Sequence, residues 1–364
     1  MKSLSIAILS IMTSFAYAHS ADLENTSDVN VAANTHLVQM SDDELSATQG
    51  QALMNLTRTN DANQGLGFYR LGMEAEIEIN ANIKKLQLGC GGTNGAGNCD
   101  IDIDNLSLTG LNPVNGEYAA SDAILKNPFI EFALKNPDTA ATREILGFRV
   151  GALEALGLLS LGTNSNTSDP SDDTGINSLS GNLTLNLKNT QMTNIRACGG
   201  ALVFGACLGV WLTGSATVRD TQKQLVFNRD SQIDDLGPLT ADATILGLTL
   251  SNVHLKNQTL KAIHQIALKS ADGTGTKDFY LSLQKQAVTW PTTATSGWNA
   301  VAAQKGWWLA LPEVTIENAK ATQQISLSGV GAIFGAVFGT QVDVQGIDLA
   351  QVPAKNCYGS LTFC

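Results

Sequence analysis

Six cysteines are the side chains whose type and spacing most clearly predict chemistry in this 364-residue chain. They form three couples that are close in sequence, namely Cys90 and Cys99, Cys198 and Cys207, and Cys357 and Cys364. Local pairing closes short loops without a long-range search, and cysteines of an exported chain are expected to be oxidised. We therefore predict three local disulfides. A zinc site is disfavoured because the sequence has no C-x-x-C couple and no nearby histidine pair.

The other reactive side chains form no recognisable catalytic pattern. His254 and His264 have neither the spacing nor the context of a metal pair. The sequence lacks G-x-S-x-G, H-E-x-x-H, a P-loop and a dinucleotide fingerprint. A hydrolase that uses two carboxylates stays open as an alternative, because such pairs are made in space rather than in sequence. We predict a protein that is not an enzyme and that has no cofactor and no metal.

The segment "DIDID" resembles the start of a calcium-binding loop. An EF-hand loop needs glycine at its sixth position and glutamate at its twelfth, where this chain has Asn105 and Leu111. We expect a strand with Asp100, Asp102 and Asp104 facing solvent. A calcium site of another kind, built by the loop "SDPSDDTG", remains an alternative.

The N-terminus has the three parts of a secretory signal. Lys2 supplies the positive charge, Leu4 to Phe15 is apolar, and Ala16-Tyr17-Ala18 has the small-x-small pattern of a cleavage site. The apolar stretch is shorter than the roughly 20 residues that span a bilayer. We expect cleavage after Ala18 and a location in the periplasm, in the outer membrane or at the cell surface.

The composition disfavours one class of partner, nucleic acid, and favours a fold rich in β-strands. The 33 acidic and 22 basic residues give a net charge of −11, which repels phosphate backbones and disfavours nucleic acid as a partner. Charged residues are only 15% of the chain, so asparagine, threonine, serine and glutamine must supply much of the polar surface. That composition suits strands and turns better than exposed helices.

Apolar and polar residues alternate in "MEAEIEINANI", Met73 to Ile83, which predicts a strand with one buried face. The phase slips at Lys84-Lys85, which predicts a β-bulge. The loop between Cys90 and Cys99 and the alternating segment after it then predict a disulfide-closed hairpin. The expected fold is mainly β: elongated twisted sheets or an irregular β-prism or solenoid-like body, with a short N-terminal helix.

Two patterns recur along the chain. The first is apolar-x-apolar-x-Asn, which ends at Asn105, Asn189, Asn252 and Asn318. The second is the similarity between "VFGACLG" at 203–209 and "IFGAVFG" at 333–339. Because the intervals between the asparagines vary, the patterns indicate a degenerate duplication of one β unit rather than a regular solenoid.

A short helix is predicted just behind the signal. Ser41 is a suitable N-cap, Glu44 completes a capping box, and Gly50 ends the helix. The helix either covers the exposed edge of the first strand or is a recognition handle. The expected organisation is: signal peptide 1–18, flexible lead-in 19–38, capped helix motif 39–52, first β lobe 53–161, polar linker or loop 162–182, and second β lobe 183–364.

Two parts of the sequence resemble Fil-type pilus-system proteins and related secreted Gram-negative proteins. The first part is "SDDELSATQGQA", whose matching residues are Asp42, Asp43, Glu44, Leu45, Ser46, Gly50 and Gln51. The second consists of "KNPFIEFALKN" and "REILGFRVG", whose matching residues are Asn127, Pro128, Phe129, Gly147, Phe148 and Arg149. The resemblance covers mainly the first 150 residues. It implies association with the outer membrane or with a surface filament, without a known activity.

We therefore predict a non-enzymatic structural or adhesive component of a pilus-like cell-surface system. Its partners would be other pilus-system or outer-membrane proteins, and partner strands could add to its sheet edges. One alternative is an outer-membrane β-barrel or pore, although aromatic residues are only 6% of the chain. The other is a binding module for apolar ligands, lined by the Gly/Ala/Phe segments.

Overall fold

The computed structural model describes residues 54–91, 94–113, 121–164, 169–198, 202–203, 206–292, 297–321, 323–327 and 341–354. These residues form one compact unit. They are almost entirely β-strands joined by turns, with three short 3₁₀ helices at η3 (Pro170–Asp172), η4 (Ile245–Gly247) and η5 (Leu260–Ala262). The mainly β prediction is therefore confirmed. The helix predicted within 39–52 lies outside the described residues.

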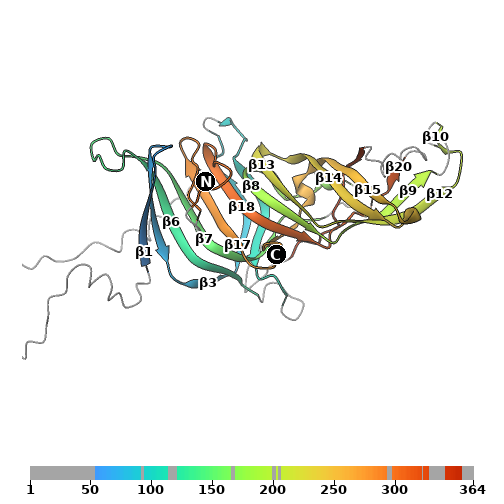
Figure 1. The fold of residues 1–364 in the computed structure, drawn as a ribbon, viewed down its shortest axis with the longest axis horizontal. Coiled ribbons are helices and arrows are strands. Elements are labelled where there is room, and N and C mark those ends of the chain that lie inside the picture. Colours follow the sequence, from blue (N-terminus) through green and yellow to red (C-terminus); the bar gives the residue numbers. More distant parts are fainter. Residues whose placement is uncertain are drawn as a thin grey trace, which may run out of the picture. The chain divides into compact units, whose positions relative to one another are not determined.

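Twelve strands form the larger sheet, which curls as it passes from β1 and β6 through β7 and β17 to β18 and β8 (Figure 1). Its strands are β1 (Met54–Asp61), β2 (Leu66–Met73), β3 (Glu76–Ile79), β4 (Ala81–Leu88), β5 (Ile101–Thr109), β6 (Ala123–Lys135), β7 (Glu144–Ser160), β8 (Ile176–Lys188), β13 (Thr221–Asp230), β16 (Gln265–Leu268), β17 (Thr276–Gln284) and β18 (Gly306–Glu317).

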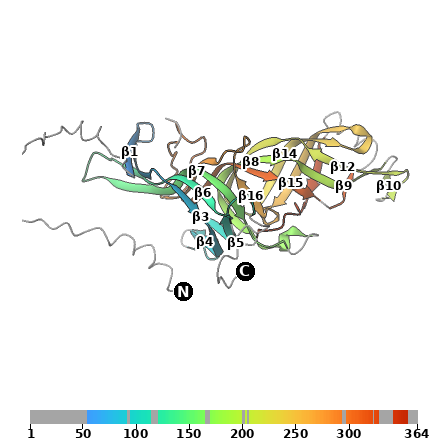
Figure 2. The same cartoon turned by 90° about the horizontal axis from the view of Figure 1, so that it is seen from below.

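A seven-stranded sheet lies beyond β8, and its main strands are grouped together in Figure 2. Its strands are β9 (Thr190–Cys198), β12 (Trp211–Val218), β14 (Gln232–Ala243), β15 (Thr249–Thr259), β19 (Lys320–Ala321), β20 (Ile325–Leu327) and β21 (Val342–Gln345). The two-residue strands β10 (Leu202–Val203) and β11 (Ala206–Cys207) form a small hairpin of their own.

Strand β7 organises the larger sheet because it is long enough to pair with different neighbours along its length. Its first part pairs with β6 on one edge and with β17 on the other. Its last residues, Leu158 to Ser160, pair with β5 and with β16. Strand β16 pairs with β18, β18 with β8, and β8 with β5. These pairings close a ring around buried aliphatic side chains such as Ile103, Leu183 and Leu268.

Strands of both predicted lobes share this sheet. Strands β16, β17 and β18 come from the second half of the chain and pair directly with β7 or with β8. Strand β8 begins at Ile176, inside the segment 162–182 that was predicted as a linker. Long-range strand pairing therefore crosses the expected boundary.

The alternating segment from Met73 to Ile83 is divided among three strands rather than forming one. Strand β2 ends at Met73, β3 pairs with β6, and β4 pairs with β5. Ile77 and Ile83 are 37% and 39% exposed, so the prediction of one buried face is wrong. The bulge predicted at Lys84-Lys85 is also absent, because β4 and β5 keep one register throughout. The change of phase instead coincides with a strand whose two faces are both partly exposed.

Two of the recurring asparagines, Asn189 and Asn318, directly follow the ends of β8 and β18, whereas Asn105 lies inside β5 and Asn252 inside β15. Asn105, Asn189 and Asn318 have φ angles of 46°, 49° and 54°, in the left-handed region that asparagine tolerates better than most residues. Asn252 does not adopt this conformation; in the same strand Asn257 does, with φ 48°. The pattern therefore identified a backbone feature at three of its four positions.

Two copies of the pattern lie side by side. Strands β8 and β18 are parallel, with Leu187 opposite Ile316. The Asn189 side chain donates to Asn318 Oδ1 at 2.6 Å. After these asparagines both copies enter the second sheet, where β19 and β20 run parallel to β9. The two copies keep one alignment from Val314 through Ala321, with register shifts before Val314 and before β20, so the duplication stays a prediction.

Replacing Asn189 with alanine should lower the free energy of unfolding by about 1–2 kcal/mol, because an ordinary side chain is strained at positive φ. The substitution also removes the hydrogen bond to Asn318. Asn189→Gly removes the same hydrogen bond, but glycine adopts positive φ without strain. The glycine variant should therefore lose clearly less free energy of unfolding than the alanine variant. Urea unfolding of the two variants measures the difference, and equal losses would contradict the backbone explanation.

Two of the three predicted disulfides are present. Cys90–Cys99 closes the connection between β4 and β5, with an S–S distance of 2.00 Å. Cys198–Cys207 joins the end of β9 to β11. Cys357 and Cys364 lie outside the described residues. Both observed disulfides join cysteines that are nine residues apart, as the prediction of local pairing requires.

Candidate interaction surface

Strand β1 is the outermost strand at one end of the larger sheet. It pairs with β2 from Met54 to Asp61 without a register shift, and in the described part of the chain it has no second neighbour. The strand contains no proline and no bulge, which are common protections of an exposed edge. Its outer backbone N–H and C=O groups can therefore accept another strand.

One face of the sheet beside this edge is apolar and open. A row of aliphatic side chains crosses six adjacent strands in register: Leu56, Leu71, Ile130, Val150, Leu281 and Leu309. Leu56 is 71% exposed at the edge, and Val150 is still 38% exposed in the middle of the sheet. Monomeric proteins rarely leave so many neighbouring apolar side chains in water without a function.

A second row on the same face is rich in aromatic side chains. It consists of Arg58, Tyr69, Phe132, Phe148, Leu283 and Trp307, again in register from β1 to β18. Phe148 and Trp307 contact each other edge to face, with ring centroids 6.1 Å apart. Together the two rows are called the open apolar face below.

Charged side chains lie beyond both ends of the open apolar face. At one end Lys126 pairs with Glu154 at 2.9 Å, and Glu154 stands opposite Lys277 in the sheet. At the other end Lys285 pairs with Glu144 at 2.8 Å. The face is therefore an apolar band between two charged borders.

The opposite face of the same strands is covered. The segment between β17 and β18 brings Val288, Trp290 and Ala303 over Phe68 and Phe129, and these residues form a second buried cluster. Phe68 and Trp290 meet edge to face at 5.6 Å. On this face, the segment between β17 and β18 shields the apolar side chains of the sheet. In the described residues, no comparable segment covers the open apolar face.

A buried ion cluster lies within the covered face. Arg149 and Glu131 stand directly opposite each other on β7 and β6, and their side chains are 0% and 2% exposed. Arg149 Nε donates to Glu131 Oε2 at 2.6 Å, and Nη2 donates to the Pro291 carbonyl at 2.6 Å. Burial lowers the pKa of Arg149, and the charge of Glu131 opposes that shift.

Aromatic rings enclose this guanidinium. Its central carbon lies 4.8–5.1 Å from the ring centroids of Phe129, Tyr280 and Trp290. Burial raises the pKa of Tyr280 to about 12, so its hydroxyl is neutral at physiological pH. The arrangement holds a fixed cation against the Glu131 carboxylate. Its geometry fits a structural role, because the ion pair and the rings surround the guanidinium.

The residues of the second resemblance meet in and around this cluster. Phe129 and Arg149 are in contact across β6 and β7. Phe148 stands opposite Phe132 on the open apolar face, and Gly147 stands opposite Ala133. Sequence reasoning missed Glu131, although its place in "NPFIEF", two residues after Phe129, is the signal that could have identified it. The first resemblance, at Asp42, Asp43, Glu44, Leu45, Ser46, Gly50 and Gln51, lies outside the described residues.

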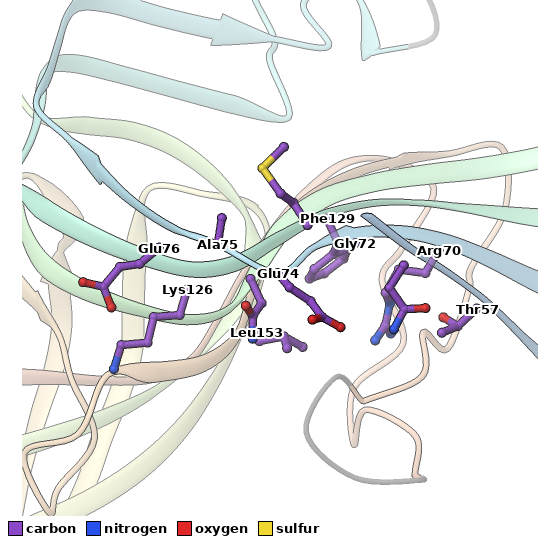
Figure 3. A pocket seen from close by; sticks show the side chains of 12 residues that line it. Thr57, Arg70, Gly72, Glu74, Ala75, Glu76, Lys126, Phe129 and Leu153 are labelled. Atoms are coloured by element: carbon purple, nitrogen blue, oxygen red, sulfur yellow. The ribbon is translucent and has the colours of Figure 1, made fainter. Parts of the chain in front are cut away.

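A groove of about 620 Å³ runs beside the cluster, near the junction of β2 and β3. In Figure 3, Arg70 and Thr57 lie at one end, Glu76 and Lys126 at the other, and Glu74, Phe129 and Leu153 between them. Arg70 stacks on Phe129 and approaches Glu131 at 3.4 Å. The groove mixes both signs of charge, so it does not define one class of ligand.

The aspartates of "DIDID" are engaged in the protein rather than facing solvent freely. Asp100 is buried and accepts hydrogen bonds from the Trp307 backbone N–H and the Asn94 side chain. Asp102 and Asp104 both pair with Lys85, at 2.6 and 2.8 Å. A lysine held between two carboxylates supplies the positive charge that a calcium ion would supply. In the described ranges, no three acidic, histidine or cysteine side chains come together as a metal site.

Acid should weaken this lysine–aspartate cluster. Burial alone would raise the pKa of Asp102, but hydrogen bonds from Lys85, Gln87 and Asn177 bring it below its ordinary value. Such a carboxylate stabilises the fold at neutral pH, and its contribution is lost as the pH falls below about 4. We expect Asp102→Asn to lower the unfolding temperature at pH 7 and to have a smaller effect at pH 3, because the contribution of this carboxylate declines as the pH falls through its lowered pKa. A constant effect at both pH values would contradict this linkage.

Comparison with protein-family models, with curated proteins and with solved structures finds no match to this chain. A search of the described residues for apolar helices of bilayer-spanning length also finds none.

Proposed function

We propose that this protein is a non-enzymatic structural or adhesive component of a pilus-like surface system, exported by its signal peptide. The observation that carries the proposal is the unprotected edge strand β1 beside the open apolar face. An added strand gains main-chain hydrogen bonds from such an edge, and its side chains can pack on the exposed row. The two disulfides support export to an oxidising compartment.

The expected partner is another protein of the same assembly, which adds a strand antiparallel to β1. Leu56 and Met54 are 71% and 56% exposed on this strand, so they can contribute apolar contacts to the new pair. The resemblance to Fil-type proteins points to the same kind of partner.

Proline substitution tests strand addition at β1. Neighbouring residues of an edge strand alternate between bonding inward and pointing their backbone groups outward. Of Thr57→Pro and Arg58→Pro, one therefore removes an outward N–H and leaves the pairing with β2 intact. We expect that variant to fold but to lose its place in the surface assembly. The readouts are thermal unfolding of the purified protein and recovery of the protein in the sheared surface fraction of cells.

The outcomes of the proline test distinguish strand addition at β1 from assembly through another surface. A folded variant that is absent from the surface fraction supports strand addition. If both proline variants fold and assemble like the wild type, β1 is not the assembly edge and the proposal fails. Thr221→Pro, at the start of β13 on the same sheet, is the control for a proline that does not affect β1.

A further inference from the structure

A second groove, of about 550 Å³, lies where the turn closed by the Cys90–Cys99 disulfide meets the end of β13 and the start of β18. Its volume is within the range of small-molecule sites. No residue of β1 lines this groove, so it is separate from the edge proposed for strand addition. The side chains that matter most for its chemistry are Asn94, Asp100, Asn228, Arg229, Lys305 and Trp307.

A buried carboxylate organises the wall of the second groove. Asp100 is 3% exposed and accepts hydrogen bonds from the Trp307 backbone N–H at 2.9 Å and from Asn94 Nδ2 at 3.0 Å. A Cβ atom at Gly89 or at Gly306 would lie 2.2 or 2.5 Å from Asp100 Oδ2, so glycine is needed for this close approach. The wall is therefore fixed by tight packing around one carboxylate.

Arg229 is held in the groove by only one of its nitrogens. It lies at the register shift between β13 and β8, with φ 59°, a backbone conformation that is unusual for a long side chain. Its Nη1 donates to Asn94 Oδ1 at 2.8 Å and lies 3.4 Å from Asp100 Oδ1. Its Nε and Nη2 have no partner among the described residues, and the side chain is 40% exposed. These donors are available to a ligand.

The charges of the second groove do not cancel. Among the described residues that line it, Asp100 is the only carboxylate, and Arg229 offsets its charge. Lys305 is exposed and forms no ion pair with any described residue. The nearby Asp230 carboxylate accepts from the Asn228 backbone N–H and is not part of the lining. One positive charge is left over in a chain of net charge −11, which favours an anionic ligand.

The uncharged part of the lining suits hydroxyl groups and an apolar ring face. Asn228 and Gln304 are exposed amides, which donate and accept hydrogen bonds as a hydroxyl group does. Trp307 adds an aromatic surface, and its edge-to-face contact with Phe148 holds the ring in place. The CH groups of a sugar ring pack well on such a surface, while its hydroxyl groups bond to the amides.

We propose that the second groove binds an acidic sugar unit of a polysaccharide, such as a uronic acid. Arg229 and Lys305 bind the carboxylate, and Trp307 packs against the ring. Such a ligand would serve the adhesive role proposed above, on which this site depends for its cell-surface setting. Binding by the purified protein can be measured apart from assembly, so a failure here would leave strand addition at β1 intact.

Isothermal titration calorimetry of the mature, disulfide-bonded protein tests the site. The acidic probes are trigalacturonate, a hyaluronan tetrasaccharide and sialyllactose. Maltotriose is the neutral control, and inorganic phosphate is the control for an anion without a sugar ring. We expect at least one acidic probe to bind, and to bind more tightly than either control. No binding of any acidic probe would overturn the proposal, as would equal affinity for maltotriose or for phosphate.

Substitutions at the two cations locate the binding. Lys305→Gln should weaken binding of that probe about tenfold, because it removes a charge-assisted contact, whereas Lys305→Arg should stay within about threefold of the wild type. Arg229→Gly should also weaken binding about tenfold, and glycine adopts the positive φ at this position without strain. Lys277→Gln is the matched control, because Lys277 is exposed on β17 and does not line the groove. Unchanged binding by Lys305→Gln, or an equal loss in Lys277→Gln, would overturn the assignment.

Discussion

Glu131→Ala is expected to lower the free energy of unfolding by about 3–5 kcal/mol, the range found when one partner of a buried ion pair is removed. The substitution leaves the Arg149 guanidinium without its carboxylate in a site where the arginine side chain is 0% exposed. The Pro291 carbonyl and three aromatic rings remain, but none of them neutralises the charge. Arginine cannot escape this cost by losing its proton at ordinary pH.

Urea unfolding measures this loss, and a double variant separates charge from packing. Glu131→Leu combined with Arg149→Met replaces the pair by apolar side chains of similar size, which is often neutral or stabilising. We expect the double variant to recover most of the stability lost by Glu131→Ala. A single-variant loss below about 1 kcal/mol would show that Arg149 reaches water or another anion.

Gly151→Ala is expected to cost roughly 3 kcal/mol or more, because overpacking at a site bounded by backbone has no easy relief. A Cβ atom at Gly151 would lie 2.2 Å from the Phe279 carbonyl oxygen and 2.8 Å from Tyr280 Cβ. The clash would push β7 away from β17 beside the Arg149 cluster.

Gly72→Ala is the matched control for this prediction. Gly72 lies in β2 of the same sheet, and its nearest atom to an added Cβ is the Asn55 carbonyl oxygen at 3.8 Å. We expect this variant to unfold within about 1 kcal/mol of the wild type, by urea denaturation. Equal losses at Gly72 and Gly151 would mean that strand propensity, rather than close approach, explains the glycine at position 151.

The local features of this fold were predictable because neighbouring residues determine them. The period-two pattern around Ile101 and Ile103 identified a strand, and the spacing of Cys90 and Cys99 identified a bridge. The repeated asparagine pattern indicated a recurring unit, and Asn189 and Asn318 do stand together. Each of these signals is contained in a stretch of a few residues.

Long-range pairing could not be predicted in the same way. The segment Met73 to Ile83 has a regular pattern, but its pairing with β6 and β5 breaks it into separate strands. The open apolar face depends on the register among six strands that are far apart in sequence, from Leu56 to Leu309. The partner of Arg149 was missed for the same reason, because an antiparallel register brings Glu131 opposite it.

The location of the protein is the most direct test of the account as a whole. Intact cells that produce the full chain with an epitope after Ala140, in the exposed turn between β6 and β7, should be treated with a protease that cannot cross the outer membrane. We expect the protein to start after Ala18, to be cleaved on intact cells and to copurify with the surface fraction. Recovery from the cytosol with an uncleaved N-terminus and reduced cysteines would contradict the account.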